Sequence, residues 1–340
     1  MYRIAVHFQG GDGQLRHAAS ASHMKRIALE EHFMAPGFEP YWLKTVEDVE
    51  PSRYEQVLAR LNDFGEQRLA AMDTSGIGMA VLSLAGPGVQ IEPDRAKATK
   101  LARQGNDFLA AQMQKKPDRY LGFAHLAVQD AKAAADELER CVRDLKFSGA
   151  MINGHTNGQY LDHPDTFPLW ERAEALGVPI YIHPADPITP MPALDGYRGL
   201  KRATWEWTVE TGTHALRIVF SGLFDRFPKA KLALGHLGET LPYQLWRFDS
   251  RAKLYGVKLK KKPSDYIREN LVVTTSGMFS FEPIDCALKA LGRENVMYSA
   301  DYPFEDPAEA GAFMDELPLD RGVIEDISYN NAARLLRIGA

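Results

Sequence analysis

Near its C-terminal end the chain reads VMYSADYPFE over residues 296–305. An apolar run suited to a buried strand ends there in a single acid, Asp301, followed by an aromatic residue, a proline and a second aromatic residue. Two other apolar runs end in histidine, at His183 and at His236. Charged groups rarely lie beside buried strands without a partner or a metal. The pattern therefore predicts a polar site where several strands end.

The first apolar run of the globular part leads into Glu30 and His32. Residues two apart in a strand point to the same face, so these two side chains share a side. If that side is the interior of a parallel barrel, both converge with His183, His236 and Asp301 at one end of the barrel. Two carboxylates with two or three imidazoles suit a borderline divalent ion such as zinc or manganese.

Strand-like and helix-like segments alternate along the chain. Eight such βα units in about 315 residues predict an α/β fold, a single (β/α)8 TIM barrel with enlarged loops. A doubly wound open sheet is the competing fold, but it favours a glycine-rich turn after the first strand, where this chain has two acids. The expected strands are residues 25–30, 78–84, 120–125, 149–153, 178–183, 231–236, 271–275 and 296–301. The expected helices include residues 131–145, 205–227, 241–254 and 283–291.

Composition sets wide bounds on function. The chain has 340 residues, is 45% hydrophobic and carries a net charge of −5, which suits a globular protein and argues against nucleic-acid binding. It contains no apolar stretch near the ~20 residues that span a bilayer, so no membrane partner is expected. Its two cysteines lie far apart in sequence, which argues against a disulfide framework and predicts a cytoplasmic protein.

The N-terminal segment differs from the rest. Residues 1–23 show no sustained period and fit neither a signal peptide nor a transit helix. We interpret them as a disordered or cloning-derived extension that precedes a metal-dependent barrel over residues 24–340. The basic run at residues 258–262 is interpreted as a solvated loop.

Several short motifs together resemble a known family. The chain resembles the amidohydrolase superfamily and, within it, the nonoxidative aromatic acid decarboxylases of the γ-resorcylate and 2,3-dihydroxybenzoate decarboxylase group. The motifs that carry this resemblance are ALEEHF at 28–33, HP at 183–184, GHLGE at 235–239, TTSG at 274–277 and SADYPF at 299–304.

This resemblance implies a set of site residues and an activity. The implied ligands of one Zn²⁺ or Mn²⁺ ion are Glu30, His32, His183 and Asp301, and the implied catalytic pair is His236 with Glu239. Many superfamily hydrolases hold two metals through a lysine after the fourth strand, whereas this strand ends in Asn153, which favours a mononuclear site. The implied reaction is decarboxylation of an ortho-hydroxylated benzoate, such as 2,6-dihydroxybenzoate, to the phenol and CO₂. A homotetramer or dimer is also implied.

The implied reaction requires a proton donor, a base and groups that bind the substrate. The ring carbon that bears the carboxylate must be protonated before the C–C bond breaks, and Asp301 is the candidate proton donor. His236 and Glu239 suit a base and its orienting acid. Arg247 is a candidate for holding a carboxylate or hydroxyl of the substrate, although an ion pair with a nearby acid is an equal alternative. Phe304 is a candidate for packing on the ring, or a plain core residue.

Two other classes of function remain open on the sequence. One is a mononuclear metal-dependent hydrolase of a lactone or amide, which would need a metal-bound water as nucleophile. The other is a barrel that binds a ligand or metal without catalysis, since a fold does not determine a function. The stretch Ala185-Asp186-Pro187 departs from the resorcylate group and leaves the identity of the aromatic acid open.

Overall fold

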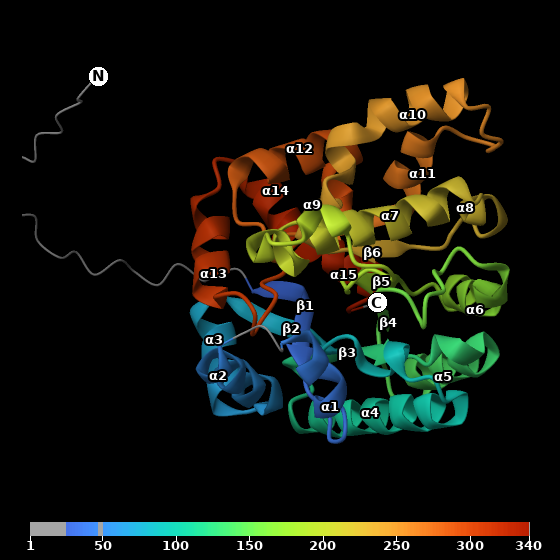
Figure 1. Ribbon diagram of the computed structural model, residues 1–340. Coiled ribbons are helices and arrows are strands. Elements are labelled where there is room, and N and C mark those ends of the chain that lie inside the picture. The colour runs from blue at the N-terminus through green and yellow to red at the C-terminus, as the bar shows by residue number, and fades with distance from the viewer. Residues whose placement is uncertain (1–24, 47–49, 340) are drawn as a thin grey trace, which may run out of the picture.

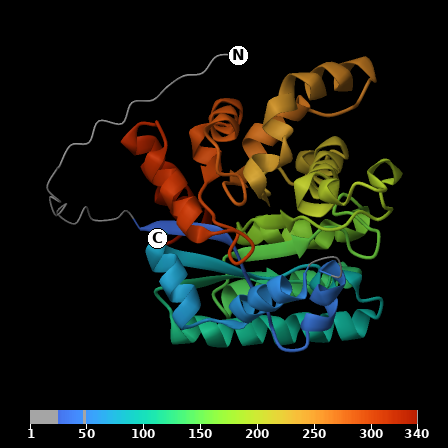
Figure 2. The same cartoon turned by 60° about the vertical axis from the view of Figure 1, so that its left-hand side comes forward.

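A computed structural model describes residues 25–46 and 50–339. Eight parallel strands pair in sequence order and form a nearly closed barrel, with helices packed around it (Figures 1 and 2). The predicted (β/α)8 barrel is confirmed, and the interpretation of residues 1–23 lies outside the described residues. The strands are β1 (Arg26–Phe33), β2 (Ile77–Leu84), β3 (Tyr120–His125), β4 (Gly149–Asn153), β5 (Ile180–His183), β6 (Leu232–Leu234), β7 (Leu271–Thr274) and β8 (Val296–Met297).

Two strands end at least two residues before the position that the sequence predicts. β6 ends at Leu234 and β8 ends at Met297, so His236 and Asp301 lie in the connections that follow these strands. The backbone at both residues is left-handed, with φ of +51° at His236 and +66° at Asp301. A left-handed conformation cannot continue an extended strand. Both side chains still lie at the C-terminal end of the barrel.

The helices follow the predicted alternation with some differences in detail. The expected helix at residues 205–227 is two helices, because Gly222 adopts a left-handed conformation with φ of +77°. The solvated loop at 258–262 is followed by a helix that the sequence analysis did not identify, which begins at Pro263. The helices are α1 (Glu39–Trp42), α2 (Pro51–Asn62), α3 (Glu66–Thr74), α4 (Arg95–Lys115), α5 (Ala131–Arg143), α6 (Phe167–Leu176), α7 (Glu206–Phe220), α8 (Leu223–Arg226), α9 (His236–Glu239), α10 (Leu245–Leu254), α11 (Pro263–Asn270), α12 (Phe281–Leu291), α13 (Pro307–Glu316), α14 (Arg321–Glu325) and α15 (Asn331–Leu336).

The interior of the barrel contains an apolar layer to which every strand contributes. Helix α15 packs against this layer through Ala332, and the Asn331 amide donates to the Val296 carbonyl over 2.8 Å. Helix α15 therefore closes the end of the barrel opposite the site. The interior layer consists of Ile27, Leu29, Val81, Phe123, Met151, Tyr181, Ala233, Val272 and Met297.

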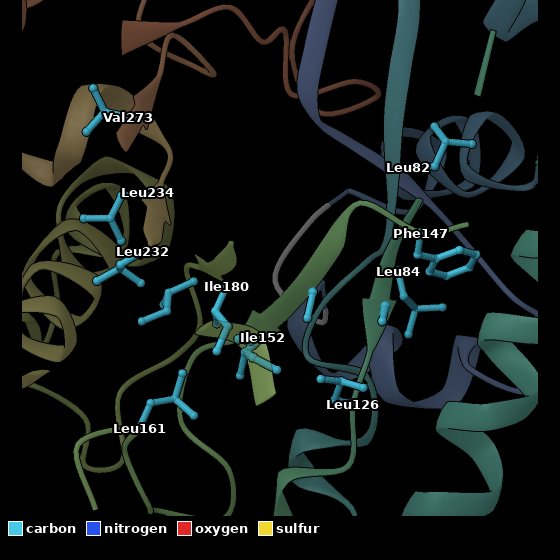
Figure 3. Packing of buried hydrophobic residues seen from close by; sticks show 14 of the residues in the cluster. Leu82, Leu84, Leu126, Phe147, Ile152, Leu161, Ile180, Leu232, Leu234 and Val273 are labelled. Atoms are coloured by element: carbon cyan, nitrogen blue, oxygen red, sulfur yellow. The ribbon is translucent and has the colours of Figure 1, made fainter. Parts of the chain in front are cut away.

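A second apolar core lies between the outer face of the barrel and the helices. Figure 3 shows side chains of this core, including Leu82, Ile152 and Leu234 from alternate positions of the strands. Both faces of each strand are thus buried, which explains why the strands appear in the sequence as continuous apolar runs. Among the described residues, no helix is long and apolar enough to cross a membrane. Cys141 and Cys286 are free thiols.

A β-bulge in β1 determines which side chains face the interior. Ala28 pairs with Ala80 and Glu31 with Leu82, so β1 has one more residue than β2 over this stretch. Strict alternation from Leu29 would turn Glu31 inward. The extra residue instead turns the side chains of Glu30 and His32 toward the site at the end of the barrel.

Candidate active site

Four ligand-type side chains meet at the C-terminal end of the barrel. Glu30 and His32 come from β1, His183 from the end of β5 and Asp301 from the loop after β8. One ligand atom from each lies within 4.8 Å of the others, and all four side chains are buried. The structure therefore brings together the four residues that the sequence analysis named as ligands.

The chemistry of this cluster fits a metal ion. Among the described residues, Glu30 Oε1, His32 Nε2 and Asp301 Oδ1 are buried without a hydrogen-bond partner. Such atoms cost about 1–3 kcal/mol each when they stay unsatisfied. His32 Nε2 lies 3.2 Å from Asp301 Oδ1, and His183 Nε2 lies 3.7 Å from Glu30 Oε1. Two carboxylates and two imidazoles that converge in this way can hold one divalent ion.

Hydroxyl groups orient the Glu30 carboxylate. Its Oε2 accepts hydrogen bonds from Tyr181, Thr274 and Ser276, which leaves Oε1 free to face the cluster. A side chain at Gly235 would bring a Cβ to 2.5 Å from this same oxygen, so glycine is required there. Burial raises the pKa of Glu30, and the neighbouring His236 and the Ser276 hydroxyl act in the opposite direction.

The two histidine ligands are also held by their other ring nitrogen. His183 donates from Nδ1 to the Pro184 carbonyl over 2.8 Å, which leaves the lone pair of Nε2 directed at the cluster. His32 Nδ1 lies 3.2 Å from the Ser83 hydroxyl. Burial, together with the nearby His32, lowers the pKa of His183 to about 3. A neutral imidazole oriented through its second nitrogen is the form that binds a metal.

His236 and Glu239 form a hydrogen-bonded pair beside the cluster. His236 Nδ1 lies 2.6 Å from Glu239 Oε1, and its Nε2 lies 3.8 Å from Asp301 Oδ2. Burial alone would lower the pKa of His236, but the charge of Glu239 and contacts with Asp301 raise it well above its usual value. For Asp301, burial alone would raise the pKa, but the neighbouring His236 and His32 imidazoles outweigh burial and lower it. The pair can therefore hold a proton next to Asp301.

The backbone that carries the pair is strained. His236, Leu237 and Glu239 all have φ between 51° and 53°, in the left-handed region that side chains other than glycine rarely adopt. Each such residue costs about 1–3 kcal/mol, and strain of this kind clusters at functional sites. The contact between His236 and Glu239 therefore costs conformational free energy, which the packing of the surrounding fold must offset.

A cavity of about 410 Å³ opens above the cluster. Its size lies within the ~300–1,000 Å³ range of small-molecule sites. Phe304 lines it, with its ring centroid 5.4 Å from that of His32. Phe304 is 37% exposed, so it is a wall of the cavity and not a core residue. Other lining residues are Trp42, Arg53, Tyr54, His183, Trp207, His236, Glu239, Met278, Asp301 and Glu305.

Arg247 lies elsewhere. It is exposed on α10 and is not among the residues that line the cavity. The alternative that it pairs with Asp249 is not supported either, because Asp249 accepts hydrogen bonds from the backbone and hydroxyl of Ser264. A contact between Arg247 and the substrate remains a prediction.

Several residues of the site escaped the sequence analysis. Arg53 and Glu305 bring opposite charges to the cavity wall, and Tyr181 and Ser276 hold Glu30. Tyr181 carried a usable signal, because it lies two residues before His183 and so shares its face of the strand. Arg53 carried none, since it lies on the exposed helix α2 within an ordinary polar pattern.

Comparison with known proteins identifies the family. The family model described as Amidohydrolase matches residues 23–338 of this chain. The chain belongs to the amidohydrolase family. Among curated members of the family, γ-resorcylate decarboxylase from a Rhizobium species is 39% identical over 335 residues, covering 92% of this chain and 98% of the relative.

Solved structures of family members superpose closely on this chain. A dihydroxybenzoic acid decarboxylase from a Polaromonas species, with bound manganese and the inhibitor 2-nitroresorcinol, is 38% identical with a TM-score of 0.87, covering 93% of this chain and 98% of the neighbour. A 5-carboxyvanillate decarboxylase from Sphingomonas paucimobilis is 39% identical with a TM-score of 0.86, covering 92% and 99%.

Proposed function

We propose that this protein is a metal-dependent carboxy-lyase that removes CO₂ nonoxidatively from an ortho-hydroxylated benzoate. The observation that carries the proposal is the buried cluster of Glu30, His32, His183 and Asp301 at the floor of an aromatic-walled cavity. Near-full-length relatives that are decarboxylases of hydroxybenzoates support it.

The four clustered side chains would hold one divalent ion. That ion would supply a template for the substrate's carboxylate and ortho oxygen and would neutralise their charge. We propose manganese in preference to zinc. Two oxygen ligands suit the harder ion, and the Polaromonas relative contains manganese.

Asp301 is the proposed proton donor to the ring. The proton adds to the carbon that bears the carboxylate, the C–C bond to the carboxylate then breaks, and its electron pair restores the aromatic ring as CO₂ leaves. The lowered pKa of Asp301 means that its proton must come from a neighbour, and His236 at 3.8 Å has a raised pKa. We therefore assign His236 as the proton source and Glu239 as the group that orients it.

The walls of the cavity would hold the ring and exclude water. Phe304 stands beside His32 at the floor and offers a face for aromatic packing. Arg53 is a cation on the cavity wall and would pair with an anionic group of the substrate. The favoured substrate class is 2,6-dihydroxybenzoate and its close relatives.

We also propose that the enzyme is a homo-oligomer, a tetramer or a dimer. Both ends of α10 and the residues that flank it carry large exposed apolar side chains, and this helix lies at the edge of the molecule in Figure 1. Tyr243 is 83% exposed, and Trp246 and Tyr255 are each 76% exposed. Aromatic side chains such as these are enriched at protein interfaces. The two free, widely spaced thiols support our proposal of a cytoplasmic enzyme.

Release of CO₂ tests the proposed reaction. Protein loaded with Mn²⁺ is incubated with 2,6-dihydroxybenzoate, 2,3-dihydroxybenzoate, salicylate or 5-carboxyvanillate. We expect release from at least one acid and none after chelation of the metal. Absence of release from all four acids, with turnover of a lactone, would replace the decarboxylase with the hydrolase.

A further inference from the structure

Glu31 is a buried carboxylate that lies between two of the clustered residues and takes no part in the cluster. Its side chain is 2% exposed. Oε1 accepts hydrogen bonds from the Ser299 hydroxyl over 3.0 Å and from the Ala300 amide over 2.9 Å. Oε2 accepts from the Tyr302 amide over 3.1 Å. One carboxylate thus binds the chain on both sides of Asp301.

These bonds lie at the seam where the barrel closes. β8 is two residues long and pairs with β7, and beyond Met297 the chain passes β1 without a regular ladder among the described pairings. Three backbone bonds cross this part of the seam. The Leu29 amide donates to the Tyr298 carbonyl over 3.4 Å, the Asp301 amide to the Glu30 carbonyl over 3.1 Å, and the His32 amide to the Tyr302 carbonyl over 2.7 Å. The Glu31 carboxylate adds three hydrogen bonds at a place where a longer β8 would pair with β1.

The seam separates Asp301 from two of the other clustered residues. Glu30 and His32 lie on the β1 side, and Asp301 lies on the other side in a loop with φ of +66°. A residue with left-handed backbone geometry is unfavourable by itself, so the conformation of this loop depends on the contacts that surround it. Any shift across the seam changes the separation of Asp301 Oδ1 from His32 Nε2, which is 3.2 Å.

Arg68 supports the same seam from outside the site. Its guanidinium is buried and donates to the His32 carbonyl over 2.6 Å. It also lies over the ring of Tyr302, 4.9 Å from the centroid. Arg68 therefore contacts both His32 and Tyr302, the two residues between which the Glu31 carboxylate bridges β1 and the loop.

We propose that Glu31 is a positioning residue that sets Asp301 against Glu30 and His32. It acts through the loop and touches neither substrate nor metal. Part of the inference rests on the proposed function, because the position of Asp301 matters for turnover only if Asp301 protonates the ring. The effect on metal geometry does not depend on that reaction.

The test uses Glu31→Gln in the full-length, Mn²⁺-loaded protein. The amide keeps the size of the side chain but replaces one acceptor oxygen with a donor, so one of the three loop contacts becomes repulsive. Loss of such supporting contacts typically costs 10–100-fold in metal affinity or activity. We expect Mn²⁺ affinity and kcat each to fall by about 10–100-fold, with KM unchanged.

A matched control separates positioning from stability. Glu137 is a comparably buried carboxylate on α5 that accepts hydrogen bonds from Asn106 and Arg140, away from the site. We expect Glu137→Gln to lower the melting temperature and to leave Mn²⁺ affinity, kcat and the Mn²⁺ electron paramagnetic resonance spectrum unchanged. Glu31→Gln should alter that spectrum, because the spectrum reports ligand geometry.

Each outcome decides between the two roles. A folded Glu31→Gln protein with wild-type Mn²⁺ affinity, spectrum and kcat would overturn the proposal. If Glu31→Gln does not fold, Ser299→Ala removes one contact of the carboxylate together with the bonds of the same hydroxyl to the Glu30 backbone, and the spectrum should change in the same way. An unchanged spectrum there would also overturn the proposal. If the wild type decarboxylates none of the benzoates, the proposed reaction fails, yet Mn²⁺ affinity and the spectrum still test the positioning role.

Discussion

The two ends of the barrel use the same strands for opposite purposes. At the end closed by α15 the strands present an apolar layer that includes Val81, Met151 and Val272. Two residues further along, the same faces present polar groups such as Ser83, Asn153 and Thr274, with the metal-type cluster among them. Two residues along each strand thus separate the apolar layer that stabilises the fold from the polar groups of the candidate site.

The difference between the two ends is also energetic. Burial of the apolar layer contributes about 25 cal/mol for each Å² removed from water. At the other end, unpartnered polar atoms and left-handed residues such as His236 cost free energy. A bound ion would offset that cost, so metal should stabilise the fold by mass action. Changes at the two ends should therefore separate function from stability.

The largest effect is expected from Asp301→Asn. The amide keeps an oxygen for the metal but cannot deliver the proton, and general acid catalysis contributes about 10²–10⁴-fold. We expect a folded protein that retains Mn²⁺ and loses turnover by at least that factor, measured as CO₂ release alongside metal content. An active variant with full metal would remove Asp301 as proton donor.

Next in size is the loss of metal in His32→Ala. This change removes one of four converging ligand groups and leaves Glu30 and Asp301 as neighbouring carboxylates. We expect Mn²⁺ content to drop well below one ion per chain, as measured by elemental mass spectrometry of the purified protein. A matched His163→Ala control, at an exposed histidine outside the cluster and the cavity lining, should remain fully loaded. Full loading of His32→Ala would exclude His32 as a ligand.

A smaller change in rate is expected from Glu239→Gln. The charge of Glu239 is a main cause of the raised pKa of His236, so its removal should lower that pKa. We expect kcat to fall about 10–100-fold while metal content stays at the wild-type level. The pH profile provides the check: the alkaline limb of kcat, where His236 loses its proton, should move to lower pH. A profile that does not move would separate the pair from proton transfer.

The smallest effect on activity is expected at the opposite end of the barrel. Met151 is 2% exposed in the apolar layer, and Met151→Ala should lower the free energy of unfolding by about 2–5 kcal/mol. Denaturant unfolding measures this loss, and kcat should remain at the wild-type value. A large fall in kcat in the folded variant would show that the two ends are not separable.

Periodicity in the sequence predicts most of this arrangement. Apolar runs locate the strands, and the residues at which they stop point to Glu30, His183 and Asp301. Periodicity does not show the extra residue in β1, because a bulge leaves no mark in an apolar run that is buried on both faces. The role of Glu31 also depends on contacts to residues 268–271 positions away, and no local pattern reveals such pairs.

The position of Arg247 could not be predicted for a related reason. The predicted helix at residues 241–254 is observed as a 3₁₀ helix, Leu241–Gln244, followed by α10. Which face of a helix meets the cavity depends on how the helix packs. The buried face of α10 carries Leu245 and Ala252, whereas Arg247 is exposed. The cavity instead takes its arginine from α2, at Arg53.

The central claim is that the polar end of the barrel protonates and decarboxylates a hydroxybenzoate with a bound divalent ion. It is tested most directly by incubating the Mn²⁺-loaded protein with 2,6-dihydroxybenzoate in D₂O and analysing the product by NMR. We predict resorcinol with one deuterium on the carbon between the two hydroxyl groups, and no product from chelated protein or from Asp301→Asn. Unchanged 2,6-dihydroxybenzoate in the loaded wild-type sample together with no CO₂ release from the other three acids, or equal conversion after chelation, would contradict the account.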